Sequence, residues 1–387
     1  MHHRLLPSTC VALGLAVALV ACSDDGGGAS PADAELSVVE VIELPAPAFS
    51  TLQISPEGDA WAQLAGDELC VAPVGAEPSC EPLGDLDPQS FSFRADPLRL
   101  LATDDVFVRF REPDVVEVDV ASGATVRLTD DGVDELVDGA VIDVQPFEGP
   151  GGRVHLFRST TRLGDEYRFV VARLDDDGAV EEVDGLRLVP DRVPLGPPRP
   201  IGDDRFVMSA ADLSDGEELV VVLDLGLGTI EPVDTGGIRD PKVVDTEPGR
   251  VLLMDLQSFR RLDETNPFFV LDIGTGRLEQ LSSTPDDERT MLAAGFVPGG
   301  DAVAVAMAPL FDRDSGLGAL VVHPLDDTGA LGEPVTIAEG DDFLGVDDDG
   351  DVVTPIGTGW GTELVWTTND RLLLATSEQQ LLVFDTS

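Results

Sequence analysis

LVVVLDLGLGTIEPV, residues 219–233, is the stretch that decides the fold. It begins with an aliphatic run that ends at Asp224, Gly228 follows four residues later, and a second β-rich run starts at Thr229. An Asp side chain hydrogen-bonds its own backbone, and Gly tolerates positive φ, so this pair is typical of a hairpin turn. The stretch therefore predicts two antiparallel strands joined by a tight turn.

The same kind of run recurs seven times along the chain, at a spacing of about 48–60 residues, the scale of a four-stranded propeller blade. Each run is preceded by a turn and another apolar run, and further β-rich runs lie outside these. The pattern predicts four strands per repeat, with a weak innermost strand in the fourth repeat, where prolines crowd it. The seven runs are Leu69–Val74, Val115–Val120, Phe169–Leu174, Leu219–Leu225, Phe268–Ile273, Leu320–Leu325 and Leu381–Phe384.

The two ends of the repeat region complement each other. The seventh repeat lacks an outer strand after Leu381–Phe384, whereas Ser37–Leu44 is a spare β run before the first repeat. Pairing the two closes a ring and leaves no open edge there. The sequence therefore predicts an all-β fold over residues 37–387, a seven-bladed β-propeller closed by its N-terminal strand. An open pair of β-sandwich sheets is the alternative.

The turns also carry a family resemblance. Ser55-Pro56-Glu57-Gly58 and the Asp-x-x-x-Gly hairpins resemble the repeats of TolB-type periplasmic propellers over most of residues 37–387. The resemblance implies a propeller fold and binding in the cell envelope. It transfers no functional residue to this chain.

The first 21 residues have the features of a secretory signal. Arg4 precedes sixteen uncharged, mostly apolar residues, 5–20, which are fewer than the 18–20 that a membrane span needs. A permanent span is the alternative. Leu19-Val20-Ala21-Cys22 resembles the lipobox of bacterial lipoproteins. The resemblance implies that residues 1–21 are a signal peptide, removed before Cys22, and that Cys22 is lipidated and anchors the protein to a membrane.

Residues 22–36 are rich in Gly, Ser, Ala and Asp, and are expected to form a flexible tether behind the lipidated Cys22. Stable anchoring takes two or more acyl chains. The residue after Cys22 is Ser23, whereas Asp at this position marks inner-membrane retention in enterobacterial lipoproteins. The resemblance therefore implies the outer membrane, on its periplasmic or surface face.

The charge is strongly negative. The chain has 74 acidic and 24 basic residues, a net charge of −50, and loss of Arg4 with the signal makes it −51. Such a surface repels nucleic acid and anionic lipid and attracts cations and basic partners. We therefore expect no nucleic-acid partner. Solubility is the alternative reason for the acidic surface.

Two cysteines remain behind the tether. Nine residues separate Cys70 from Cys80, and Pro73, Gly75 and Pro78 between them exclude a helix and indicate a hairpin. In an oxidising compartment we expect a disulfide that contributes about 2–3 kcal/mol. A thiolate metal site needs more ligands, and the sequence clusters none nearby.

Motifs for catalysis are absent from the sequence. The mature chain keeps only His155 and His323, in predicted strands of separate blades, and has neither a Gly-x-Ser-x-Gly elbow nor a phosphate-binding loop. We therefore predict no enzyme and no cofactor. The one metal candidate is a calcium site at Asp347, Asp349 and Asp351, although the spacing departs from an EF-hand. A solvated acidic loop is the alternative.

Arginine and aromatic residues recur in the loops between the second and third strands of four blades. These loops share one face of a propeller, and both residue types are favoured at interface hot spots. The alternative is that the aromatics pack the loops and the arginines pair with local acids. The predicted binding face consists of Phe107, Arg109, Phe110, Arg111, Arg162, Tyr167, Phe259, Arg260, Arg261, Phe311 and Arg313.

Taken together, these patterns predict an envelope-anchored, non-enzymatic binding or scaffold module. Its expected partner is an envelope protein, or an anionic or glycan ligand, that meets the loop arginines. Two alternatives remain, a propeller enzyme that uses carboxylates on glycans and a structural subunit of an envelope complex.

Overall fold

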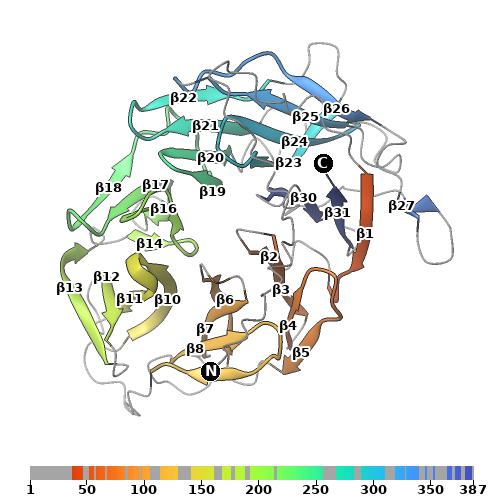
Figure 1. Ribbon diagram of the computed structural model, residues 1–387. Coiled ribbons are helices and arrows are strands. Elements are labelled where there is room, and N and C mark those ends of the chain that lie inside the picture. Colours follow the sequence, from red (N-terminus) through yellow and green to blue (C-terminus); the bar gives the residue numbers. More distant parts are fainter. Residues whose placement is uncertain are drawn as a thin grey trace, which may run out of the picture.

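The structure is a computed structural model in which seven antiparallel sheets are arranged around a common axis (Figure 1). We call the sheets blades 1–7, and strands A to D run from the innermost to the outermost. The structure describes residues 37–46, 52–55, 58–65, 68–82, 86–94, 96, 98–104, 114–129, 141–160, 168–175, 179–187, 192–212, 216–255, 267–282, 289–309, 319–326, 328–339, 345–346, 352–353, 364–367, 371–375 and 380–385.

Blades 1 to 4 follow one another along the chain. Blade 1 is β2 (Gln53–Ile54), β3 (Ala60–Ala65), β4 (Glu68–Pro73) and β5 (Ser79–Pro82). Blade 2 is β6 (Leu86–Phe93), β7 (Arg99–Asp104), β8 (Val115–Asp119) and β9 (Thr125–Arg127). Blade 3 is β10 (Val141–Gly149), the 3₁₀ turn η2 (Pro150–Gly152), β11 (Arg153–Thr160), β12 (Arg168–Leu174) and β13 (Val180–Arg187). Blade 4 is β14 (Arg192–Pro194), β15 (Arg199–Pro200), β16 (Arg205–Asp212), β17 (Glu218–Asp224) and β18 (Thr229–Val233).

Blades 5 and 6 continue the order, and blade 7 combines the two ends of the repeat region. Blade 5 is β19 (Pro241–Glu247), β20 (Arg250–Asp255), β21 (Phe268–Asp272) and β22 (Arg277–Gln280). Blade 6 is β23 (Arg289–Phe296), β24 (Ala302–Pro309), β25 (Ala319–Pro324) and β26 (Val335–Glu339). Blade 7 is β29 (Leu364–Trp366), β30 (Arg371–Ala375), β31 (Gln380–Asp385) and β1 (Ser37–Glu43). A small hairpin, β27 (Gly345–Val346) and β28 (Val352–Val353), lies between blades 6 and 7 in the chain.

The ring closes through β1. This strand pairs antiparallel with β31, with Val41 opposite Leu382, so the first described strand completes the last blade. The seven blades, the N-terminal closing strand and the propeller fold implied by the TolB-type resemblance are confirmed, and a β-sandwich is excluded. The weak A strand of blade 4 is confirmed as well, since β14 and β15 are separate pieces that both pair with β16.

The Asp–Gly pairs form the C–D turns as predicted. In blade 5, Asp272 Oδ1 accepts the Thr275 N–H at 2.7 Å, and Gly276 has a φ of 71°. Blade 6 differs in one respect. Its strand C ends at Pro324, and Asp326 begins a longer turn in which the carboxylate accepts the Thr328 and Ala330 N–H groups.

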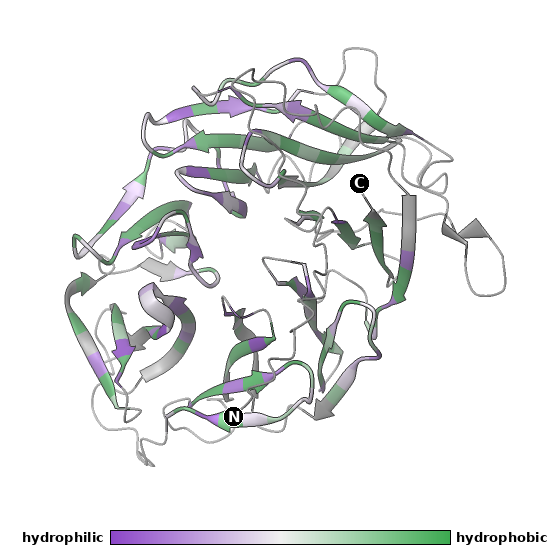
Figure 2. Cartoon of the chain, in the orientation of Figure 1, coloured by the Kyte–Doolittle hydropathy of each residue, from purple (hydrophilic) through white to green (hydrophobic). Residues whose placement is uncertain are grey.

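The hydrophobic core is divided among the joints between blades. Seven clusters of buried side chains in the described part each span two adjacent blades, one cluster for each joint. Figure 2 shows hydrophobic residues along the strands of each blade. Each blade is therefore buried on both faces, and its stability depends on both neighbours.

The side chain at one position of strand A makes a different kind of contact with the next blade in different joints. We call it the inner-ring position, the residue opposite the third residue of strand B. The seven residues at this position are Gln53, Ser92, Phe147, Arg199, Asp245, Gly295 and Val365.

Polar side chains at this position bind the backbone of the next blade. Gln53 Nε2 donates to the Phe91 carbonyl at 2.9 Å, and Ser92 Oγ donates to the Pro146 carbonyl at 2.8 Å. Asp245 Oδ2 accepts the Phe296 N–H at 2.8 Å. Because strand A is the innermost strand of each described blade, these side chains satisfy backbone groups that the sheet leaves unpaired.

Two joints use packing at the inner-ring position. The Phe147 ring meets Phe206 of blade 4 edge-on, with centroids 5.3 Å apart. Gly295 lets the backbones of blades 6 and 7 approach each other, since an added Cβ would lie closer than 3.0 Å to the Leu364 carbonyl oxygen. The joints thus share one geometry but differ in chemistry.

Candidate functional site

The two faces of the ring differ in the length of their connections. Because the strands alternate in direction, A–B and C–D turns lie on one face, the turn face, and B–C and D–A connections on the other, the loop face. A–B turns are as short as residues 248–249 and 150–152. The loop face carries the long connections 105–114, 128–140, 256–267 and 340–363. Long connections on a rigid scaffold are the usual carriers of binding function.

Arginines near the turn face make contacts within the protein. Arg94 forms ion pairs with Glu117 of its own blade and Glu148 of blade 3, and also donates to the Gly152 carbonyl at 2.8 Å. Arg250 of blade 5 donates to the Gly300 carbonyl and, at 3.1 Å, to the Asp326 carbonyl of blade 6. These arginines therefore connect neighbouring blades.

The residues of the predicted binding face lie outside the described residues. Their loops start and end on the loop face, at strand ends that the structure places in blades 2, 3, 5 and 6. The eleven residues are Phe107, Arg109, Phe110, Arg111, Arg162, Tyr167, Phe259, Arg260, Arg261, Phe311 and Arg313, and Cys22 with the tether lies outside the described residues too.

Sequence reasoning missed the acid pair Asp245 and Glu247 of β19. Burial raises the pKa of Asp245, opposed by hydrogen bonds from the Phe296 and Thr246 N–H groups and by the charge of Arg199. Burial and the nearby Asp245 charge raise the pKa of Glu247. Because 74 acids are spread along the chain, only the strand register could have singled out this pair.

A carboxyl group with a raised pKa can act as a general acid, the chemistry of the glycan-enzyme alternative. In Asp245, however, Oδ1 accepts the Thr246 N–H and Oδ2 accepts the Phe296 N–H, both at 2.8 Å. Both oxygens thus bind backbone, and the geometry gives this carboxylate a role in the joint between blades 5 and 6.

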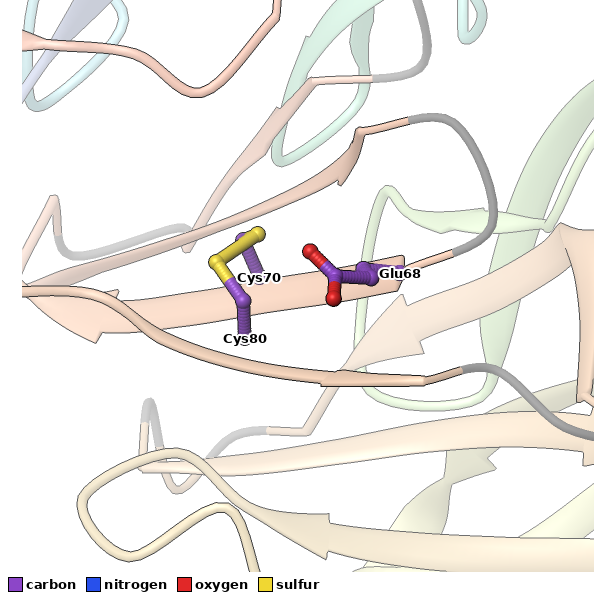
Figure 3. Close-up of side chains that lie close together, drawn as sticks. All are labelled: Glu68, Cys70 and Cys80. Atoms are coloured by element: carbon purple, nitrogen blue, oxygen red, sulfur yellow. A yellow bond between two sulfur atoms is a disulfide. The ribbon is translucent and has the colours of Figure 1, made fainter.

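The predicted disulfide is confirmed. Cys70 on β4 and Cys80 on β5 are cross-strand partners and are bonded to each other (Figure 3). The expectation that no further metal ligand clusters nearby is wrong, because the Glu68 carboxylate and the two sulfurs lie within 4.8 Å of one another. With the sulfurs bonded to each other, neither is a thiolate, and the cluster lacks the ligands that a zinc site requires.

The other residues considered as metal ligands are the three aspartates of the predicted calcium site and the two histidines. Asp347, Asp349 and Asp351 lie outside the described residues, although β27 and β28 flank them. His155 and His323 lie in separate blades, on β11 and β25, as predicted. His155 Nδ1 is 3.1 Å from the Arg153 carbonyl, and its ring stacks on Phe147 at 5.5 Å.

Within the described part of the chain, no helix has the length and hydropathy that a membrane crossing requires.

Comparison with known proteins yields similarity of fold only. No protein-family model and no curated protein matches the chain. A structure of the Dos1 propeller is 11% identical, covers 87% of this chain and 77% of its own, and has a TM-score of 0.45. TolB from Acinetobacter baumannii is 14% identical, with 80% of this chain and 65% of its own covered and a TM-score of 0.37.

The β-propeller domain of the Trilobed protease from Pyrococcus furiosus is 11% identical, with 88% of this chain and 96% of its own covered and a TM-score of 0.44. At these identities and TM-scores, no similarity carries an argument about ligand or activity.

Proposed function

We propose that the protein is a non-enzymatic binding module of the cell envelope, anchored through a lipid on Cys22, whose loop face binds an anionic or aromatic-bearing partner. The observation that carries the proposal is the asymmetry between the faces. Every connection longer than ten residues between the described strands leaves the loop face. Six of the 24 bases, all arginines, fall in the B–C loops there, although the protein is otherwise strongly acidic. A planar guanidinium suits carboxylate and phosphate groups.

The direction of β1 supports this arrangement. Ser37 pairs with Asp385, which also pairs with Arg371, the first residue after the A–B turn of blade 7. The start of β1 therefore lies at the turn face, and the proposed tether leaves the ring from there. A membrane anchor on that side directs the loop face away from the membrane.

We expect Arg109→Ala, Arg260→Ala and Arg313→Ala, made together, to release the partner that chemical cross-linking recovers from intact envelopes. The matched control, Arg173→Ala, Arg205→Ala and Arg277→Ala made together, removes the same charge from solvent-accessible arginines whose ion pairs lie outside the loop face. Such pairs contribute about 1 kcal/mol or less each, so the control folds and keeps the partner. Equal partner yields from the wild type and the loop-face variant would show that these arginines do not bind it.

Lipidation is tested separately. We expect Cys22→Ala to abolish metabolic labelling with a fatty-acid probe and to leave the signal uncut, because the thiol is the acceptor of the lipid in the lipobox resemblance. Ser23→Ala, next to it, is the control and keeps the label. A labelled Cys22→Ala protein would contradict the anchor while leaving the loop-face proposal open to its own test.

A further inference from the structure

His323 on β25 is fully buried, with 0% of its surface exposed, and neither ring nitrogen has a hydrogen-bond partner within the described part of the chain. Its strand neighbours define the direction of its side chain. Leu320 and Val322 belong to the core between blades 6 and 7, whereas Val321 and Leu325 belong to the core between blades 5 and 6. Because side chains alternate along a strand, the imidazole of His323 faces blade 5.

The other blades show what this position normally holds. His323 pairs with Val303, the second residue of strand B in blade 6. The residues that pair with the second B residue in blades 1, 2, 4, 5 and 7 are all apolar, and each lies in the core shared with the preceding blade. They are Ala72, Val118, Leu223, Leu271 and Phe384. Blade 6 alone among these six has a titratable side chain there.

Among the described residues, no carboxylate hydrogen-bonds the imidazole of His323. Burial alone lowers the pKa of His323 to about 4, with no contribution from a charged group. The part of blade 5 that meets this joint presents Leu252, Met254 and Val270 to it. The charged groups at the edges of the joint are Asp245 and Glu247 on β19, Arg250 on β20, Asp272 on β21, Arg277 on β22, and Asp301 and Asp326 in the turns of blade 6.

We propose that the joint between blades 5 and 6 is sensitive to acid. Protonation of His323 destabilises the packing of the two blades against each other. A charged imidazolium in an apolar core without a counter-ion has a large desolvation cost, and the fold avoids it only by admitting water. The unfolded chain binds the proton at an ordinary pKa of 6.5, and the folded chain only near pH 4. The free energy of unfolding therefore decreases as the pH falls from 6.5 to about 4, and the decrease is complete below that range.

Protonation of the acids in the same joint stabilises the folded state at some residues and destabilises it at others. Burial raises the pKa of Asp245 and Glu247, so their protonation favours the folded state as the pH falls. At Asp272 burial is the largest single influence and opposes the shift, but the hydrogen bonds from its turn together lower the pKa, and at Asp326 the hydrogen bond from Thr328 is the main cause of a lowered pKa. Protonation of these two acids therefore disfavours the folded state. Only a comparison with a variant that lacks the imidazole isolates the contribution of His323 to the pH dependence of stability.

His323→Leu in the full-length protein is the test, because Leu223 and Leu271 occupy the same position in blades 4 and 5. Urea unfolding from about pH 7.5 to about pH 4.5 spans the titration. We expect the folding equilibrium constant of the wild type, relative to the variant, to fall by about tenfold per pH unit once the pH is below 6.5. Hydrogen exchange should rise first in β23 and β25 of the wild type, after correction for the intrinsic rate.

His155→Phe is the matched control, since it removes the other buried histidine and lies in blade 3. It should leave the acid-induced exchange of β23 and β25 unchanged. His323→Val, with Val118 as its precedent, provides a second variant should Leu overfill the site. A His323 variant that folds yet keeps the wild-type pH dependence would overturn the proposal, as would acid opening that starts in other blades.

Discussion

Removal of residues 37–44 should lower the stability of the protein by about 4 kcal/mol or more, a loss that urea or thermal unfolding measures directly. The deletion takes away β1 and with it the whole ladder to β31, from Ser37–Asp385 to Glu43–Gln380. It also removes Ile42 and Leu44 from the core between blades 7 and 1. Burial of each such side chain stabilises a protein by about 1.5–3 kcal/mol.

Deletion of residues 24–31 is the control, because it shortens the chain equally and keeps β1. We expect this control to unfold like the wild type. The β1 deletion should also associate with itself, because β31 then presents an unpaired edge. An unchanged melting temperature after loss of β1 would contradict closure through this strand.

Gly295→Ala should destabilise the ring by about 2–3 kcal/mol, although the change adds a single methyl group. The added Cβ would lie closer than 3.0 Å to the Leu364 carbonyl oxygen of blade 7. The added Cβ is fixed to the backbone of β23, and the carbonyl oxygen belongs to the backbone of β29. Neither atom can move away by a side-chain rotation. The joint between blades 6 and 7 must widen, and its cluster around Ala304, Leu372 and Phe384 loses contacts.

Gly202→Ala is the matched control, because its added Cβ meets only the Arg205 side chain, at 3.9 Å. This variant should unfold within about 0.5 kcal/mol of the wild type. Equal stabilities for the two variants would show that blades 6 and 7 can move apart at Gly295 without a loss of stability.

The propeller could be predicted because its signals are local. The Asp224–Gly228 turn and its equivalents mark hairpins within a few residues, and the repeat of such hairpins indicates blades. Ser37–Leu44 was recognisable as a closing strand because the seventh repeat lacked an outer one. The hairpin β27–β28 was not predicted, since two-residue strands leave too short a pattern.

The joints could not be predicted, because they depend on register between segments far apart in sequence. Nothing near Asp245 indicates that its carboxylate accepts the N–H of Phe296, 51 residues away. Likewise, His323 looked like an ordinary strand residue until the pairing with Val303 placed it among apolar equivalents. The disulfide was predictable because its hairpin is short, whereas its neighbour Glu68 shares a face with Cys70 only once the strand is formed.

The entry of the chain at the turn face has a mechanical consequence. In the proposed arrangement, a pull on the anchor acts on β1 at Ser37, and a partner bound to the loops of blades 2, 3, 5 and 6 pulls the rest of the ring, β31 included, in the opposite direction. The two strands are then loaded in shear along their length, and the hydrogen bonds of the ladder share the force. Had β1 entered from the loop face, the same pull would peel the bonds apart one at a time. The closing strand is thus oriented to hold the ring together under tension between membrane and partner.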